Sequence, residues 1–208
     1  MELFDPAAPD VSFRRNAIMW HLTDRELAMG FTDSARLMAE HWEQDGPSDL
    51  LFVPLVYNSR HALELVLKDT IRATAARLRK SGRNDPKLQS EALDDWLALK
   101  AGHSLHKLAE RLDKMLDELG WDSLPDDTHE VLMSLHELDP NGESFRYASV
   151  RKKDGGFEDA SRPHVESEGY GKAVVDVVAM HDHFDRAFAR IAQLEDYADY
   201  QDAMSGRS

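Results

Sequence analysis

The 208 residues include no cysteine, so the chain can form neither a disulfide framework nor a thiolate metal site. This absence suits a reducing compartment, and we expect a cytoplasmic protein. No apolar run approaches the roughly 20 residues of a membrane-spanning helix, which predicts no membrane partner. The segment 1–6 has neither the basic nor the apolar part of a signal peptide, so none is expected.

The chain also has few positively charged residues compared with negatively charged ones. The chain has 25 Lys and Arg residues against 39 Asp and Glu residues, a formal net charge of −14. Such a chain repels nucleic acid as a whole, so we expect no DNA partner, and RNA would need a local basic patch. Two stretches are basic enough, 72–87 and 151–153, although both also fit the solvated ends of structural elements.

The spacing of apolar residues predicts an all-α protein, an up-and-down bundle of five to six helices with one short β-hairpin excursion. We expect an N-terminal arm over 1–22, a helical bundle over 23–200 with the β excursion at 143–160, and a disordered tail over 201–208. The helices are expected from Thr23 to Gly46, from Ser48 to about Lys80, over about 91–100, from Ser104 to Gly120, from Pro125 to Leu138, and over about 172–200.

The first of these helices begins with a capping box, Thr23-Asp24-Arg25-Glu26. Gly30 weakens its middle, which leaves two shorter helices as an alternative. The β excursion is expected to begin with a strand over 145–150 and to turn at 153–156. The face of the first helix expected to point inward consists of Leu27, Phe31, Ala35, Met38 and Trp42.

The chain is organised around the stretch 56–78, which carries an apolar face and a second, polar row. Glu64 forms i,i+4 pairs with both Arg60 and Lys68. These pairs either support a helix surface or form a buried polar network, and we favour the network because the helix is apolar around so much of its circumference. The second row consists of Tyr57, His61, Glu64, Lys68 and Arg72.

The histidines offer two pairs with a spacing that suits a metal, His103 with His106 and His181 with His183. Neither pair has a third ligand nearby in sequence, so we expect no metal and no cofactor. His103 fits a helix cap, and His181, on the apolar stripe of the last helix, fits a core histidine. The sequence contains no phosphate-cradling glycine loop and no nucleophile motif.

Three segments together resemble the HEPN domain superfamily: the helix Arg60-His61-Ala62-Leu63-Glu64-Leu65-Val66-Leu67-Lys68, the helix opening Gly102-His103-Ser104-Leu105, and Asp139 to Tyr147 with its Phe-Arg-Tyr segment. The last of these is similar to a segment of an uncharacterised bacterial branch. Order and spacing agree over about residues 24–195.

The resemblance implies a bundle that often forms a homodimer, and a metal-independent endoribonuclease or RNA-binding role in bacterial antiviral defence or toxin–antitoxin systems. Active relatives carry Arg, four to six residues, then His. Here only Arg14 or Arg15 with His21, and Arg36 with His41, have that spacing, which is about the number that chance provides.

The first hypothesis is therefore an RNA-associated HEPN-like protein that uses one polar cleft. Its catalytic candidates are His61, Glu64, Lys68 and Arg146, and its binding candidates are His103, Tyr147 and Arg60. Arg146 would hold phosphate charge, with a structural ion pair as the alternative role. The second hypothesis is a non-enzymatic module that binds a partner protein through a helical face such as 171–200.

Overall fold

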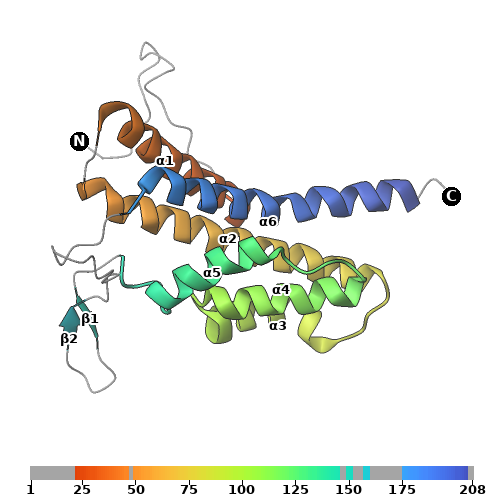
Figure 1. The fold of residues 1–208 in the computed structure, drawn as a ribbon. Helices are drawn as coiled ribbons and strands as arrows, with labels where there is room; N and C mark the ends of the chain where they lie inside the picture. Colours follow the sequence, from red (N-terminus) through yellow and green to blue (C-terminus); the bar gives the residue numbers. More distant parts are fainter. Residues whose placement is uncertain (1–21, 47–48, 146–148, 152–156, 160–174, 206–208) are drawn as a thin grey trace, which may run out of the picture.

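The chain folds into a bundle of α-helices arranged around one long central helix (Figure 1). The computed structural model describes residues 22–46, 49–145, 149–151, 157–159 and 175–205. Within these ranges the predicted all-α bundle is confirmed, with six α-helices. They are α1 (Asp24–Asp45), α2 (Asp49–Lys80), α3 (Ser90–Asp95), α4 (Leu105–Leu119), α5 (Asp126–Leu138) and α6 (Val177–Ser205).

Helix α2 forms the centre because it is apolar on more than one side. It packs against α1 and α6 on one side and against α4 on the other (Figure 1). Its buried residues include Leu55, Leu63, Leu67, Ile71 and Leu78, each at most 1% exposed. By length and composition α2 could cross a membrane, but 56% of its most apolar window is buried inside the bundle. Burial among other helices accounts for this apolarity.

Helix α1 is continuous through Gly30, so the alternative of two shorter helices is wrong. Its capping box is confirmed: the Thr23 hydroxyl accepts from the Glu26 amide, and the Glu26 side chain accepts from the Thr23 amide at 2.8 Å. Of the predicted inward face, Ala35 is buried and Phe31, Met38 and Trp42 pack against the core, but Leu27 is 36% exposed. The fully buried positions are alanines, which let the α1 backbone lie close to α2. They are Ala28, Ala35 and Ala39.

The segment predicted as the third helix, about 91–100, consists of an α-helical part and a π-helical part. The α-helical turns of α3 pass directly into a π-helical segment, Trp96–Ala101, which ends at Gly102. Ser104 then caps α4 by accepting from the Lys107 amide at 3.4 Å, and Gly120 ends α4 in the left-handed conformation, with φ 73° and ψ 27°. A short 3₁₀ helix, Pro86–Leu88, precedes α3.

Two three-residue strands, β1 (Ser149–Arg151) and β2 (Phe157–Asp159), pair antiparallel, with Ser149 opposite Asp159. Phe145, where the first strand was predicted to begin, is buried in a turn, and 146–148 lie outside the described residues. The predicted turn at 153–156 lies outside the described residues, so the hairpin as a whole stays a prediction.

The last helix runs further than expected, to Ser205 instead of about 200. The tail predicted as disordered is therefore helical over 201–205, and 206–208 lie outside the described residues. The same is true of 172–174, where α6 was expected to begin, of Ser48, and of nearly all of the expected arm. The C-terminal turns of α6 extend past the ends of the other helices (Figure 1).

Candidate functional site: a buried ion network that holds His103

The network starts from two charged side chains one helical turn apart on α2. Arg60 is 3% exposed and Glu64 is 1% exposed, and Arg60 Nη1 lies 3.3 Å from Glu64 Oε2. Buried charges of this kind persist only where they are paired and hydrogen-bonded. The spacing of four residues places both on one helix face, which here points into the bundle.

Arg60 connects α2 with two loops. Its Nη2 donates to the carbonyl oxygen of His103 at 2.8 Å and to that of Asp139 at 2.9 Å, and its Nε lies 3.3 Å from Asp139 Oδ2. The other carboxylate oxygen of Asp139 accepts from the amides of Glu143 and Ser144, at 2.8 and 3.0 Å. One arginine therefore fixes both the start of α4 and the turn after α5.

Gly142 makes this arrangement possible because it lies against the arginine. A Cβ atom at this position would lie 3.0 Å from Arg60 Nη1 and 3.0 Å from His103 Cβ. Its φ of +73° is also one that residues with side chains rarely adopt. The sequence Asp139-Pro140-Asn141-Gly142 is typical of a turn, but it does not indicate the contact of Gly142 with the network.

The Glu64 carboxylate binds two further groups. Lys68 Nζ donates to Oε1 at 2.8 Å, and His103 Nδ1 lies 2.9 Å from Oε1 and 3.1 Å from Oε2. Burial by itself would raise the pKa of Glu64, but the hydrogen bond and charge of Lys68 and the neighbouring His103 outweigh it and lower the pKa. Glu64 is therefore an ionised acceptor, and His103 Nδ1 carries the proton between them.

His103 is the member of the network that reaches the surface, with 44% of its side chain exposed. Because Nδ1 donates to Glu64, Nε2 is the nitrogen that can accept a proton from a ligand. A carboxylate that orients a histidine in this way is the arrangement found in general-base sites. Lys68, with 15% of its side chain exposed, adds a positive charge at the same edge.

The ring contacts of His61 are with residues other than Glu64 and Lys68, although His61 lies within about 60° of both around the helix. It packs against α1, with its ring centre 4.5 Å from that of Phe31, and stacks on Tyr57 at 5.7 Å. Three residues along a helix differ by about 60° in direction. This angle suffices to send His61 toward α1 while Glu64 faces α4.

Two other candidates cannot be placed, since Arg146 and Tyr147 lie outside the described residues. The pairs considered for metal binding have other surroundings. His106 stacks on His136 with a centre-to-centre distance of 5.8 Å, and His181 is buried with no hydrogen-bond partner for Nδ1 among the described residues. The part of the chain that the structure describes contains no group of three or more potential metal ligands.

Two basic residues of the stretch 72–87 make structural contacts. Arg72 pairs with Asp24 at 2.6 Å and with Asp94 at 2.8 Å, and Arg79 donates to the carbonyl of Leu88. For Arg72 and Arg79 these contacts support the interpretation of a structural role at the end of an element. Of the second basic stretch, 152 and 153 lie outside the described residues.

Asp139 was not among the predicted site residues, but it is 1% exposed and is the second carboxylate on Arg60. Its sequence signal was an Asp at the start of a turn, a position from which the side chain commonly accepts from amides further along the chain. That signal predicts the turn contacts, but it says nothing of the arginine, which lies 79 positions away in the sequence.

Comparisons with known proteins do not place the chain in a family. No protein-family model, no curated protein and no solved structure matches it.

Proposed function

We propose that this protein is an RNA-associated, HEPN-like protein of a bacterial defence or stress system, in which His103 is the group that faces the RNA. The observation that carries the proposal is the contact of half-exposed His103 with the fully buried carboxylate of Glu64. A histidine held through Nδ1 presents a fixed Nε2 for proton transfer. The order of the three HEPN-like segments in the sequence supports the same proposal.

As a metal-independent endoribonuclease, the protein would use Nε2 of His103 to take the proton of a ribose 2′-hydroxyl. The 2′-oxygen would then bond to the adjacent phosphorus while the bond from phosphorus to the 5′-oxygen breaks. The leaving 5′-oxygen would take a proton from water. The products are a 2′,3′-cyclic phosphate and a 5′-hydroxyl end.

The charge that develops on the phosphate needs a cation. Arg60 cannot supply it, because its guanidinium is 3% exposed and already bound to Glu64 and Asp139. Lys68 lies on the same carboxylate as His103, and we propose that it contributes together with Arg146. We also propose a homodimer, as in the family that the sequence resembles, which would bring two such histidines to one RNA.

The test is to incubate the purified protein with a short single-stranded RNA in the presence of EDTA and to identify the new 3′ ends. His103→Gln should abolish cleavage. His106→Gln is the matched control, because His106 is similarly exposed at the start of α4 but does not contact Glu64. Intact RNA, together with no binding at low salt, would overturn the proposal.

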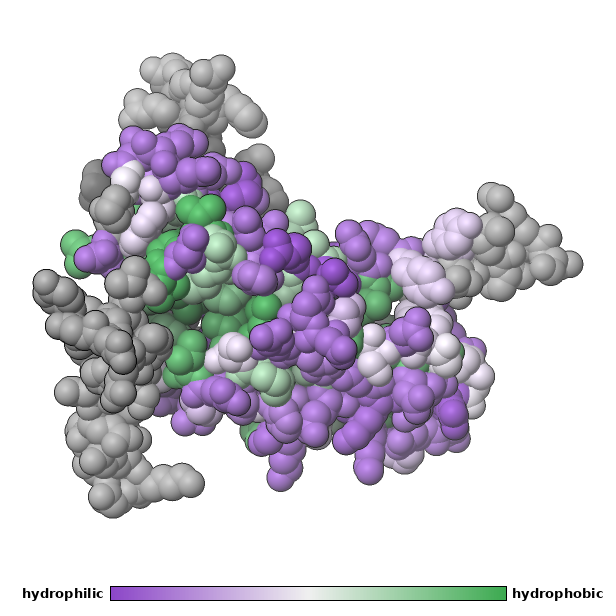
Figure 2. Space-filling view, in the orientation of Figure 1, coloured by the Kyte–Doolittle hydropathy of each residue, from purple (hydrophilic) through white to green (hydrophobic). Residues whose placement is uncertain are grey.

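A second candidate function is a non-enzymatic module for a partner protein. It is supported by the projecting end of α6, where Tyr197 is 50% exposed and Tyr200 is 59% exposed. Figure 2 also shows apolar side chains at the surface between α6 and α5. Loss of a partner from Tyr200→Ser, with RNA binding absent throughout, would favour this function.

A further inference from the structure

A second candidate site lies at the other end of α4 from His103, about 22 Å away along the helix axis. Two adjoining hollows, of about 190 Å³ and about 370 Å³, form where the end of α2, the turn after α4 and the middle of α6 meet. Trp121 and Leu194 line both. The larger hollow falls in the range typical of small-molecule sites, about 300–1,000 Å³.

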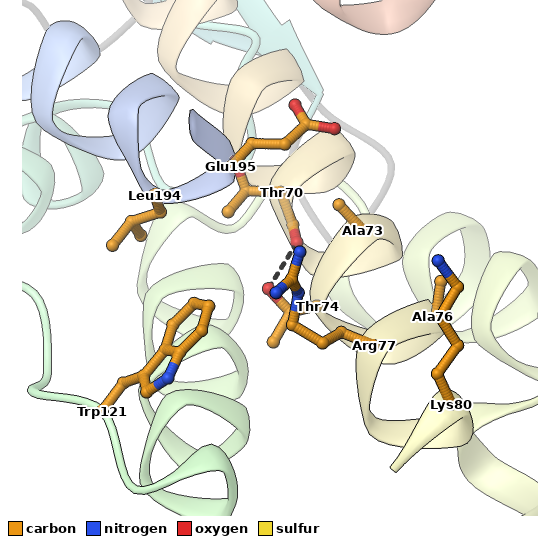
Figure 3. Close-up of a pocket in the computed structure, with 9 residues that line it drawn as sticks. All are labelled: Thr70, Ala73, Thr74, Ala76, Arg77, Lys80, Trp121, Leu194 and Glu195. Carbon is orange, nitrogen blue, oxygen red and sulfur yellow. Dashed lines mark hydrogen bonds between the residues drawn. The ribbon is translucent and has the colours of Figure 1, made fainter. Parts of the chain in front are cut away.

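The indole ring of Trp121 borders both hollows and is held in place by two neighbouring side chains. The guanidinium carbon of Arg77 lies 5.6 Å from the centre of its ring, and the ring of Tyr197 meets it edge-on with centres 5.3 Å apart. Figure 3 shows the indole of Trp121 facing the smaller hollow, with Arg77 and Thr74 beside it. An aromatic ring that borders a hollow is a surface on which a flat heterocycle can stack.

The rim of the smaller hollow is basic. Arg77 and Lys80 come from the last turn of α2 and both line it. Glu195 is the acidic residue of the lining, but its carboxylate is paired with Arg25. The smaller hollow therefore combines an aromatic wall with two basic residues, and its one acidic residue is already paired.

A second cation–π pair in the protein shows that this kind of stabilising contact forms without a hollow beside the ring. Arg111 lies 5.7 Å from the centre of the Trp96 ring, in the same kind of cation–π contact, and Trp96 lines neither hollow. Cations in the last turn of α2 would also stabilise that helix without any aromatic neighbour. What distinguishes Trp121 is the space beside its ring.

We propose that the hollows at Trp121 bind a nucleotide, with the base stacked on the indole and the phosphate held by Arg77 and Lys80. The nucleotide is either a free mononucleotide or one unit of a single-stranded RNA. This inference does not require ribonuclease activity, because the site lies apart from His103.

The test is calorimetric titration of the full chain with AMP, with adenosine and with a six-residue oligouridylate. Trp121→Leu should weaken AMP binding at least about fivefold, since stacking of a base is worth that factor or more. Trp96→Leu is the matched control and should bind as the wild type does. Lys80→Gln should weaken the binding of AMP but not that of adenosine.

The same experiment distinguishes a free mononucleotide from one unit of an RNA strand. Tighter binding of the oligouridylate, with loss on Trp121→Leu, identifies a strand, whereas binding of AMP alone identifies a free nucleotide. His103→Gln should leave the affinities for AMP and adenosine unchanged, so failure of the ribonuclease proposal does not affect this part of the result.

A readout on the unaltered protein guards against a variant that fails to fold. In ¹H–¹⁵N spectra, AMP should shift the indole signal of Trp121 more than those of the other tryptophans. No shift at millimolar AMP, or equal loss of affinity in Trp121→Leu and Trp96→Leu, would overturn the inference.

Discussion

Arg60 on α2 and Asp139 at the end of α5 form a buried ion pair, with Arg60 Nε 3.3 Å from Asp139 Oδ2. Since Arg60 also binds the carbonyl oxygens of Asp139 and His103, this one guanidinium joins three parts of the bundle. The position of His103 at the surface is therefore determined from the interior.

Removing the charge of Glu64 should destabilise the protein strongly. Glu64→Gln leaves the buried Arg60 and the partly buried Lys68 without their shared carboxylate, and the loss of one partner of such a group costs about 3–5 kcal/mol. Urea unfolding at pH 7 measures the change. Glu118→Gln, at an exposed position of the same bundle, should stay within about 0.5 kcal/mol of wild type.

The loss of folding stability in acid should also differ between Glu64→Gln and the wild type. Because the pKa of Glu64 is lowered in the folded state, ionised Glu64 stabilises the protein above its unfolded-state pKa, about 4.3. That contribution is lost as the pH falls through the lower, folded-state pKa. The wild type should therefore lose more stability than Glu64→Gln between pH 5 and pH 3. Equal losses would show that Glu64 is not held by Lys68 and His103.

Two glycines with the same backbone conformation should respond differently to alanine. Gly142 and Gly120 both have φ +73°, but a Cβ at Gly142 meets Arg60 and His103 at 3.0 Å, whereas a Cβ at Gly120 meets nothing within 4 Å. Gly120→Ala reports the backbone cost alone, about 1 kcal/mol. Gly142→Ala should cost about 1–3 kcal/mol more, from overpacking. Equal unfolding free energies would mean that the turn does not pack on the network.

Asp139 has two separable roles, and two variants should divide them. Asp139→Asn keeps an oxygen for the amides of Glu143 and Ser144 and loses only the charge beside Arg60. Asp139→Ala loses both roles and should be less stable than Asp139→Asn by about 1–3 kcal/mol, because two amides lose their acceptor. Chemical unfolding of the two variants measures this difference directly.

His181 should make the protein less stable in mild acid. Burial lowers its pKa, although Asp185 and Asp182 oppose the shift, so the unfolded chain binds a proton that the folded chain does not. Stability therefore falls as the pH drops below about 6.5, the ordinary pKa of histidine. His181→Leu should lose less stability than wild type between pH 7 and pH 5. His183→Gln, on the exposed side of α6, should keep the wild-type dependence.

Local rules predicted the ends of several elements well. The capping box at Thr23, the Ser104 cap and the left-handed Gly120 depend on residues within one turn of each other, and all three are present. The spacing of Arg60, Glu64 and Lys68 likewise predicted a buried polar cluster, since all three lie on one face of an apolar helix.

The features that the sequence did not predict depend on contacts between segments far apart in the chain, which residue spacing within one segment does not indicate. Asp139 reaches Arg60 across the bundle, and Ala28 faces the core where Leu27 was expected because α1 lies close to α2. The polar row did not indicate that His61 packs on Phe31 of α1, because an angle of about 60° on a helix can give two neighbours different partners. The hollow beside Trp121 arises where three segments meet and has no pattern of its own in the sequence.

The central claim is that Glu64 fixes His103 with Nδ1 protonated and Nε2 free to accept a proton. Long-range ¹H–¹⁵N correlation spectra of the imidazole rings, with His103 assigned through His103→Gln, measure this directly. In the neutral form of the ring, the account predicts a protonated Nδ1 and an unprotonated Nε2. A neutral ring with its proton on Nε2 would contradict this claim, because Nε2 of His103 could then not accept a proton.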